Sequence, residues 1–167
     1  NALYFAWKLK SLHDIAVGIK QLHSINVSHQ DIKPSNVLLF NTESKIGDLG
    51  RSMCPTLHGP YDEMPFSGDN TYAPPEVWFN SHIHLEWHER NYAIDCYLLG
   101  SLITYYITGL CMTALLQAEI NLTWRGRNMD KLKEYLQLAF CNILENIEKH
   151  IPFESLKKEL IEIIGYL

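Results

Sequence analysis

Apolar residues near the start of the chain recur at spacings of three and four positions. Leu12, Ile15, Ile19 and Leu22 follow this spacing. Side chains so placed lie on one face of an α-helix. We therefore expect a long helix over residues 3–24.

A different pattern follows between residues 37 and 48. A short apolar run at residues 37–40 leads into polar residues 41–44, and residues 45–47 continue toward Asp48. Short apolar runs separated by turn-forming residues are typical of paired strands. We predict a small β-hairpin with a polar loop, residues 29–36, at one end and Asp48 at the other.

Periodicity is lost over residues 51–71, where prolines and glycines recur. A loop of this length within a compact domain is usually functional or disordered. Residues 81–90 are also polar and contain His82, His84 and His88. Metal binding there is conceivable, but the histidine spacing matches no familiar ligand pattern, and we interpret the stretch as a solvated insertion.

The second half of the chain is dominated by helical patterns. Residues 93–108 are apolar on nearly every side and end at Gly109, which predicts a buried central helix. Asp95 would then be a buried acid, which must be hydrogen-bonded or paired. Two further helices are indicated on either side of Pro152, through Leu132, Leu136, Ala139, Ile143 and Ile147, and then through Leu156, Leu160 and Ile163. The predicted fold is mainly α with one short β-hairpin and about four helices.

Composition narrows the class of protein. The chain has 167 residues, enough for a single domain, and an apolar content of 47%. A net charge of −5 argues against a broad nucleic-acid surface, so any phosphate would be bound locally. No apolar run reaches the length of a membrane span. We expect an intracellular, cytoplasmic protein, and because the sequence lacks an initiator Met and a signal peptide we expect it to be part of a longer chain.

The cysteines indicate a reducing environment. Cys54, Cys96, Cys111 and Cys141 form no CxxC pair and show no regular spacing. We expect buried, reduced thiols, with a disulfide or a zinc site as the less favoured alternatives.

The polar loop holds the chemistry of the chain. Asp31, Lys33 and Asn36 lie two and three residues apart, and Asp48 begins a second motif, Asp-Leu-Gly, twelve residues later. Asn36 and Asp48 offer the hard oxygen ligands that Mg²⁺ prefers. Lys33 offers a charge for a phosphate oxygen, and Asp31 can accept or orient a proton. Together these groups suit phosphoryl transfer, whereas a lone H-x-D would be better explained as a polar turn.

The full pattern resembles a known family. Residues 29–36, H-x-D-x-K-P-x-N, resemble the catalytic loop of a eukaryotic-type protein kinase, and residues 48–50 resemble its D-F-G motif with Leu in place of Phe. Residues 68–76 resemble the segment that ends in A-P-E, and residues 95–100 resemble the start of the central helix of the larger lobe. The resemblance covers about residues 3–109 and implies a kinase C-terminal lobe: one partial domain over residues 1–167, with a catalytic loop at 29–36, an activation segment at 48–76 and a central helix at about 93–108.

The resemblance also implies a role for each site residue. Asp31 would orient the substrate hydroxyl, and Lys33 would contact the transferred phosphate of ATP. Asn36 and Asp48 would hold Mg²⁺, and Leu38 would form part of the floor under adenine. Lys33 within D-x-K-P-x-N resembles the serine/threonine class, which implies protein substrates with Ser or Thr. In the family the acid matching Asp95 braces the backbone of the catalytic loop.

Two residues depart from the family pattern. Gln30 stands where the family has an Arg that pairs with a phosphorylated activation loop, and Gln carries no charge for that role. Asp69 stands where many serine/threonine members have a Thr. A carboxylate at that position would either pair with Lys33 or repel Asp31 and the phosphates.

These departures keep other functions open. The alternative from a different class is a pseudokinase or kinase-like binding module that signals by contacts alone. A small-molecule phosphotransferase of the aminoglycoside type shares an H-x-D…N…D arrangement, but Lys33-Pro34, Pro75-Glu76 and the motif at residues 95–100 argue against it. The chain also lacks the Gly-rich loop and strand Lys of the smaller lobe. We expect that lobe to be a partner upstream, and we expect these residues alone to be inactive and to expose apolar surface.

Overall fold

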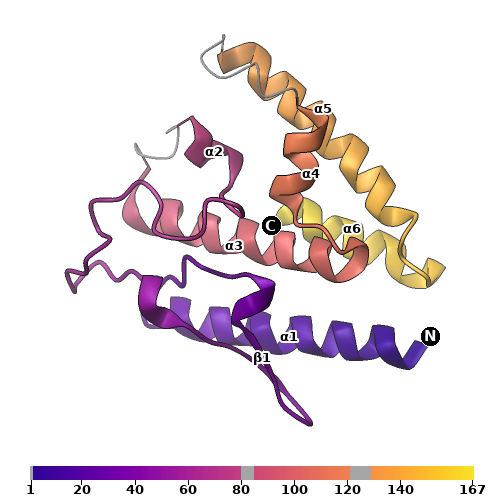
Figure 1. The fold of residues 1–167 in the computed structure, drawn as a ribbon, viewed down its shortest axis with the longest axis horizontal. Coiled ribbons are helices and arrows are strands. Elements are labelled where there is room, and N and C mark those ends of the chain that lie inside the picture. The colour runs from indigo at the N-terminus through magenta and orange to yellow at the C-terminus, as the bar shows by residue number, and fades with distance from the viewer. Residues whose placement is uncertain (1, 80–84, 121–128) are drawn as a thin grey trace.

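A computed structural model describes residues 2–79, 85–120 and 129–167. The elements follow in the order α1 (Ala2–Ser24), β1 (Val37–Leu39), β2 (Ser44–Ile46), α2 (Pro75–Trp78), α3 (Trp87–Thr108), α4 (Met112–Glu119), α5 (Met129–Glu148) and α6 (Glu154–Tyr166), as Figure 1 shows. Two 3₁₀ turns, Pro34–Asn36 and Leu49–Arg51, lie on either side of the strands. The predicted class, mainly α with a short hairpin, is confirmed.

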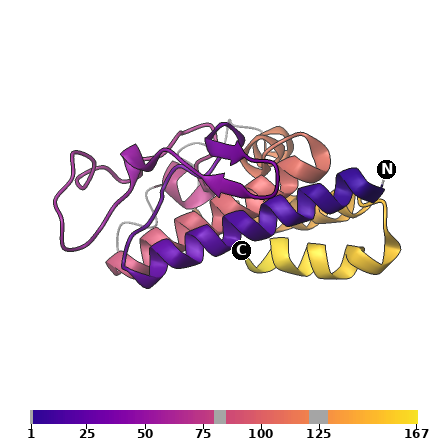
Figure 2. The same cartoon turned by 90° about the horizontal axis from the view of Figure 1, so that it is seen from below.

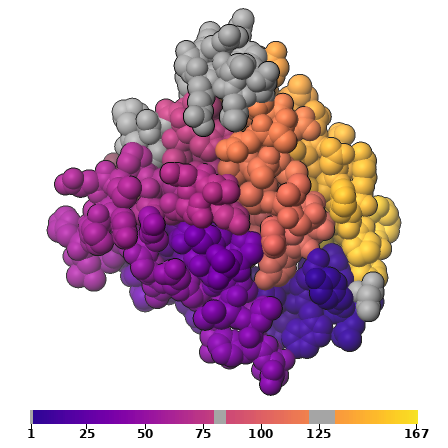
Figure 3. All heavy atoms as spheres, viewed as in Figure 1, coloured from indigo at the N-terminus to yellow at the C-terminus, as the bar shows by residue number. Residues whose placement is uncertain are grey.

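Helix α3 is the centre of the structure. It packs against α1 on one side and against α4, α5 and α6 on the other. Figures 1 and 2 show α1 and α3 side by side and running in opposite directions, with the hairpin lying along α1. In the space-filling view of Figure 3, the two strands and residues 51–71, hereafter the long loop, lie on one side of the molecule, and α4 to α6 lie on the other. The polar loop therefore lies between the hairpin and α3.

The first helix forms as its apolar spacing predicts. Leu12, Ile15 and Ile19 are buried on α1 and join Leu98 and Leu102 of α3 in the main core. Since helix propensity alone rarely stabilises a helix, packing of α1 against α3 and the hairpin supplies most of its stability.

Helix α3 begins at Trp87, six residues before the predicted start. The added turns carry a cluster of aromatic rings, in which Trp87 and His88 pack edge-on against Tyr92 and His23 of α1 stacks on Tyr92 at 4.0 Å between centroids. Apolar periodicity missed these turns because rings and polar residues, not aliphatic ones, hold them. Residues 87–90 of the predicted insertion are thus helical, while residues 81–84 lie outside the described part of the chain.

The hairpin is antiparallel and shorter than predicted, with Val37 opposite Ile46 and Leu39 opposite Ser44. One expectation about it is wrong. The polar loop enters β1 and Asp48 follows β2, so in an antiparallel pair both lie at the open end of the hairpin rather than at opposite ends. The amide of Gly47 donates to the carbonyl of Asn36 at 2.8 Å and closes that end.

The C-terminal helices confirm the prediction in part. Leu132, Ala139, Ile143 and Ile147 are buried on α5, and Leu136 is half-buried. On α6, Leu160 and Ile164 are buried, whereas Ile163 is 46% exposed, because α6 packs with Ile164 rather than Ile163 toward the core. The short helices α2 and α4 were not predicted, since each is too short to show a repeating pattern.

The cysteine thiols are all free. Cys111 is buried and Cys54 and Cys96 are half-buried, but Cys141 is exposed on α5, so the expectation of burial is wrong for that residue. Within the described ranges no single helix is long and apolar enough to cross a membrane. Among the helices that the structure describes, α3 and α4 taken together, bent by 83°, are the one pair of that length and composition.

Truncation of the buried face of α1 tests this packing. Ile15 is fully buried, whereas Val17 on the same helix is 41% exposed. We expect Ile15→Ala to lower the free energy of unfolding by about 2–5 kcal/mol, because it removes core contacts and leaves a cavity. The matched change Val17→Ala should stay within about 0.5 kcal/mol. Chemical denaturation measures both, and equal losses would contradict this arrangement.

Candidate active site

Asp95 of α3 fixes the entry to the polar loop. Its side chain is fully buried, and Oδ1 accepts a hydrogen bond from the Gln30 amide at 2.7 Å. Oδ2 accepts from the His29 amide and from Ser28 Oγ, both at 2.8 Å, and lies 2.8 Å from Nε2 of His23. The buried acid predicted from sequence is therefore satisfied, and its partners are the backbone and side chains around the loop.

Gln30 turns inward from the loop. Its backbone has a positive φ of 67°, which is unusual for a residue with a side chain. Nε2 donates to Ser28 Oγ at 2.6 Å and to the Asn91 carbonyl at 3.1 Å. Oε1 is buried without a hydrogen-bond partner among the described residues. The side chain thus braces the loop against α3.

Three of the predicted site residues come together. Asp31 is buried, and its Oδ2 lies 3.1 Å from Lys33 Nζ and accepts from Asn36 Nδ2 at 3.0 Å. Asn36 Nδ2 also donates to the Asp31 carbonyl at 2.8 Å. The 3₁₀ turn at Pro34–Asn36 folds the chain back, which brings residues two and five positions apart around one carboxylate.

The contact with Asp31 also orients the Asn36 amide. A carboxylate only accepts hydrogen bonds, so the NH₂ group of Asn36 must face it and Oδ1 must point elsewhere. No hydrogen bond within the described residues uses that oxygen. Asn36 therefore keeps a free oxygen ligand beside the Asp31–Lys33 pair.

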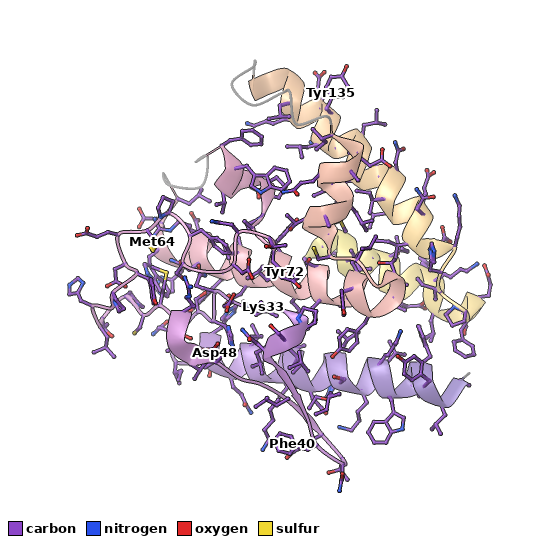
Figure 4. The ribbon with its side chains drawn as sticks, in the orientation of Figure 1. Lys33, Phe40, Asp48, Met64, Tyr72 and Tyr135 are labelled. Atoms are coloured by element: carbon purple, nitrogen blue, oxygen red, sulfur yellow. The ribbon has the colours of Figure 1, made fainter. Side chains whose placement is uncertain are left out.

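Asp48 directly follows Gly47, the residue that is hydrogen-bonded to Asn36 across the open end of the hairpin. It has a positive φ of 61°, is exposed, and accepts from the Gly50 amide at 3.3 Å through Oδ1. His29 Nε2 lies 3.0 Å from the Gly47 carbonyl and ties this segment to the polar loop. Figure 4 shows Asp48 where the chain leaves the hairpin, in the same region as Lys33. Its carboxylate makes no hydrogen bond to Asp31, Lys33 or Asn36.

Leu38 lies on β1, outside this cluster. Its side chain is 50% exposed and packs beside Gly47, where an added Cβ would come within 3.0 Å of Leu38 Cδ1. It offers an apolar surface next to the polar groups rather than a contact with them.

A segment from the long loop completes the site. Gly68 passes so close to the polar loop that an added Cβ would lie 2.1 Å from the Gln30 carbonyl oxygen. The next residue, Asp69, donates its amide to Asp31 Oδ1 at 3.1 Å and places Oδ2 3.3 Å from Lys33 Nζ. Of the two possibilities for Asp69, pairing with Lys33 is the one observed.

Lys33 and Asp69 each stabilise the charged form of the other side chain. Burial lowers the pKa of Lys33, but hydrogen bonding and charge interaction with Asp31 and then Asp69 outweigh it, and the pKa lies above its usual value. The pKa of Asp69 is lowered, mainly by the Thr71 amide and also by Lys33. Both groups therefore carry their charges at neutral pH.

Asn36 Oδ1 and the Asp48 carboxylate fit a magnesium ion. Mg²⁺ commonly takes one or two protein oxygens and fills the rest of its shell with waters and substrate phosphates. No group of three His, Cys, Asp or Glu side chains suited to a metal ion occurs within residues 2–79, 85–120 and 129–167. Asn36 Oδ1 and the Asp48 carboxylate are oxygen groups of the type that Mg²⁺ takes together with substrate phosphates.

Sequence reasoning missed the contacts that support this cluster. His23, Ser28 and Asn91 hold Asp95 or Gln30, but each stands outside the motifs. The only sequence signal was the expectation that Asp95 needs partners. Which residues supply them depends on the crossing of α1 and α3.

Comparison with known proteins agrees with these motifs. The family model described as "Protein kinase domain" matches residues 8–167. Similar curated proteins include an Aurora kinase of Debaryomyces hansenii, 28% identical over 99 residues, and a Wee1-like protein kinase of Oryza sativa subsp. japonica, 32% identical over 101 residues. The serine/threonine-protein kinase DCLK1 of Rattus norvegicus is 37% identical over 71 residues.

These alignments cover part of each protein. They span 59%, 60% and 40% of this chain, respectively, but only 22%, 18% and 16% of the three relatives. The chain thus matches less than a quarter of the length of each of these three proteins.

Gly68 offers a test of the close approach at the site. We expect Gly68→Ala to displace the loop from Gln30 and to destabilise the protein by about 1–3 kcal/mol, as overpacking typically does. Gly59→Ala is the matched control, because an added Cβ there meets Asp62 Oδ1 only at 3.5 Å. Denaturation and limited proteolysis of residues 51–71 measure the effect. Equal tolerance of both changes would contradict the placement of Gly68.

Proposed function

Since the chain belongs to the protein kinase domain family, we propose that it forms the larger-lobe part of a site that transfers phosphate from Mg²⁺-bound ATP to Ser or Thr hydroxyls of proteins. The observation that carries the proposal is the cluster of Asp31, Lys33 and Asn36, held in one place by the contacts of Asp95. Phosphoryl transfer requires positioning and charge neutralisation more than covalent chemistry, and this cluster supplies both.

Asp31 is suited to orient the attacking hydroxyl. Its carboxylate is held on both oxygens, by the Asp69 amide on Oδ1 and by Lys33 and Asn36 on Oδ2. These contacts fix the direction in which the carboxylate can accept a proton. A group that takes part in general base catalysis needs this kind of fixed geometry before its basicity matters.

Lys33 supplies positive charge beside that carboxylate. Its ammonium group is a compact point charge with three donors, suited to a phosphate oxygen that gains charge during transfer. Because Lys33 is only 19% exposed, water competes weakly for it.

Asn36 and Asp48 would hold the magnesium ion. The free Oδ1 of Asn36 and the exposed carboxylate of Asp48 lie at the same end of the hairpin, as shared ligands of one cation require. When bound, Mg²⁺ would neutralise charge on the phosphates. Leu38 on β1 would then provide apolar surface beneath the adenine ring.

Specificity for Ser and Thr is the finer part of this proposal. It is supported by Lys33-Pro34 in the loop and by relatives named as serine/threonine-protein kinases, such as DCLK1. We also propose that residues 1–167 are one partial domain, which a second lobe completes over the exposed apolar side chains of the hairpin.

Substitution of Asp31 tests the transfer reaction. In the full-length protein that contains this chain, Asp31→Asn should lower kcat for phosphorylation of a Ser/Thr peptide library by about 10²–10⁴-fold, because the proton acceptor is lost. Radiolabel transfer from Mg-ATP measures kcat, with the exposed Glu63→Gln as control.

The binding-module alternative predicts a different result. A pseudokinase would bind partners without transfer, so wild type and Asp31→Asn would show the same background. That outcome would overturn the enzymatic proposal and favour the alternative.

The 167-residue chain by itself should be inactive. Leu38, Leu39 and Phe40 are 50–74% exposed, so one face of the proposed adenine site is open to water. We expect negligible transfer and weak binding of ATP by the purified chain, together with concentration-dependent self-association through the exposed apolar surface. Calorimetry, transfer assays and light scattering measure these properties. ATP-dependent phosphorylation by the chain that is lost in Asp31→Ala would contradict this prediction.

A further inference from the structure

Asp69 is held firmly beside the polar loop by its backbone. Its amide donates to Asp31 Oδ1, and its carbonyl accepts from the Tyr72 amide at 2.8 Å. Oδ1 of its side chain accepts from the Thr71 amide at 2.9 Å. This turn leaves Oδ2 as the atom directed to Lys33.

Lys33 lies between two carboxylates. Nζ is 3.1 Å from Asp31 Oδ2 and 3.3 Å from Asp69 Oδ2. The three side chains together carry a net negative charge, at the point where the proposed function needs a positive group for phosphate. An incoming phosphate oxygen and Asp69 Oδ2 would compete for the same ammonium group.

The contact with Asp69 is the weaker of the two. It is longer, and the Asp69 side chain is 37% exposed while that of Asp31 is 6% exposed. Water screens the attraction between the two charges of an exposed ion pair more than that of a buried one. Asp69 is therefore the partner that a phosphate would displace, while Asp31 stays in contact with Lys33.

We propose that the Asp69 carboxylate is a built-in competitor of phosphate, which occupies Lys33 in the resting site and must be displaced when Mg-ATP binds. This inference rests on the proposed function. It gives the Asp69 side chain a role in setting the affinity for nucleotide, separate from the role of the Asp69 amide in holding Asp31. A neutral residue at this position would leave Lys33 paired with Asp31 alone.

Asp69→Asn tests this inference by removing the negative charge at position 69. Asn keeps one oxygen acceptor for the turn to Thr71, while its NH₂ group cannot accept a hydrogen bond from Lys33, so the negative charge and the contact with Lys33 are both removed. In the full-length protein we expect KM for Mg-ATP to fall roughly twofold to fivefold, the range set by a partly exposed ion pair. We expect kcat to change less than KM. Asp69→Glu, which keeps the charge, should keep the KM of wild type.

Asp62→Asn is the matched control. It removes the same charge from the same loop, but Asp62 contacts His58 and the Gly59 amide rather than Lys33. Its KM should equal that of wild type. An unchanged or higher KM in Asp69→Asn would overturn the inference, as would an equal fall in Asp62→Asn.

Equilibrium binding separates this inference from the proposed function. If no variant transfers phosphate, the proposed function fails, but calorimetry with Mg-ATP still reports on Asp69. Tighter binding by Asp69→Asn than by wild type would then support the competitor role. Equal or weaker binding, or no binding by any variant, would contradict it.

Discussion

The structure of the site depends on one buried carboxylate. A buried acid is costly unless its oxygens are hydrogen-bonded. Asp95 meets this requirement with the backbone amides of His29 and Gln30, so satisfying the acid also fixes the path of the polar loop. The amide held by Oδ1 belongs to a residue with positive φ, a conformation that persists only where its surroundings determine it. The apolar contacts that bury α3 thereby set the geometry of polar groups on a different segment.

Further contacts connect the segment that Asp95 holds to the rest of the site, and several of them use backbone groups. His29 links the loop to the Gly47 carbonyl, and Gly47 in turn donates to Asn36, so the open end of the hairpin is tied to the loop on both strands. Asp31 and Asn36 then constrain each other directly. Because each link uses a backbone group or a buried side chain, the position of Asp48 follows from α3 although the two are far apart in sequence.

The sequence predicted those parts of the fold that follow from local pattern. The repeat through Leu12, Ile15 and Ile19 predicted α1, and the motif spacing predicted that Asp31, Lys33 and Asn36 belong to one site. The predictions from sequence were wrong where tertiary packing determines which residues are buried and where a helix begins. Ile163 matches a helical spacing as well as Ile164 does, and only the position of α6 selects between them. The early start of α3 depends on ring stacking between α1 and α3, which no local pattern records.

Gln30 braces the polar loop without a charge. Apart from the ion pair between Asp69 and Lys33, the contacts of the long loop described here are uncharged or internal. Met53 pairs with Ser28 through two backbone hydrogen bonds, and Arg51 and Ser67 each donate to the other's carbonyl. The side-chain amide of Gln30 donates to Ser28 Oγ and to the Asn91 carbonyl of α3. The loop therefore reaches Asp31 through its own backbone, at the Asp69 amide, and position 30 contributes no cation to its docking. Asp69 therefore affects two properties of the site. Its backbone amide helps to position the long loop against Asp31, and its carboxylate changes the net charge around Lys33.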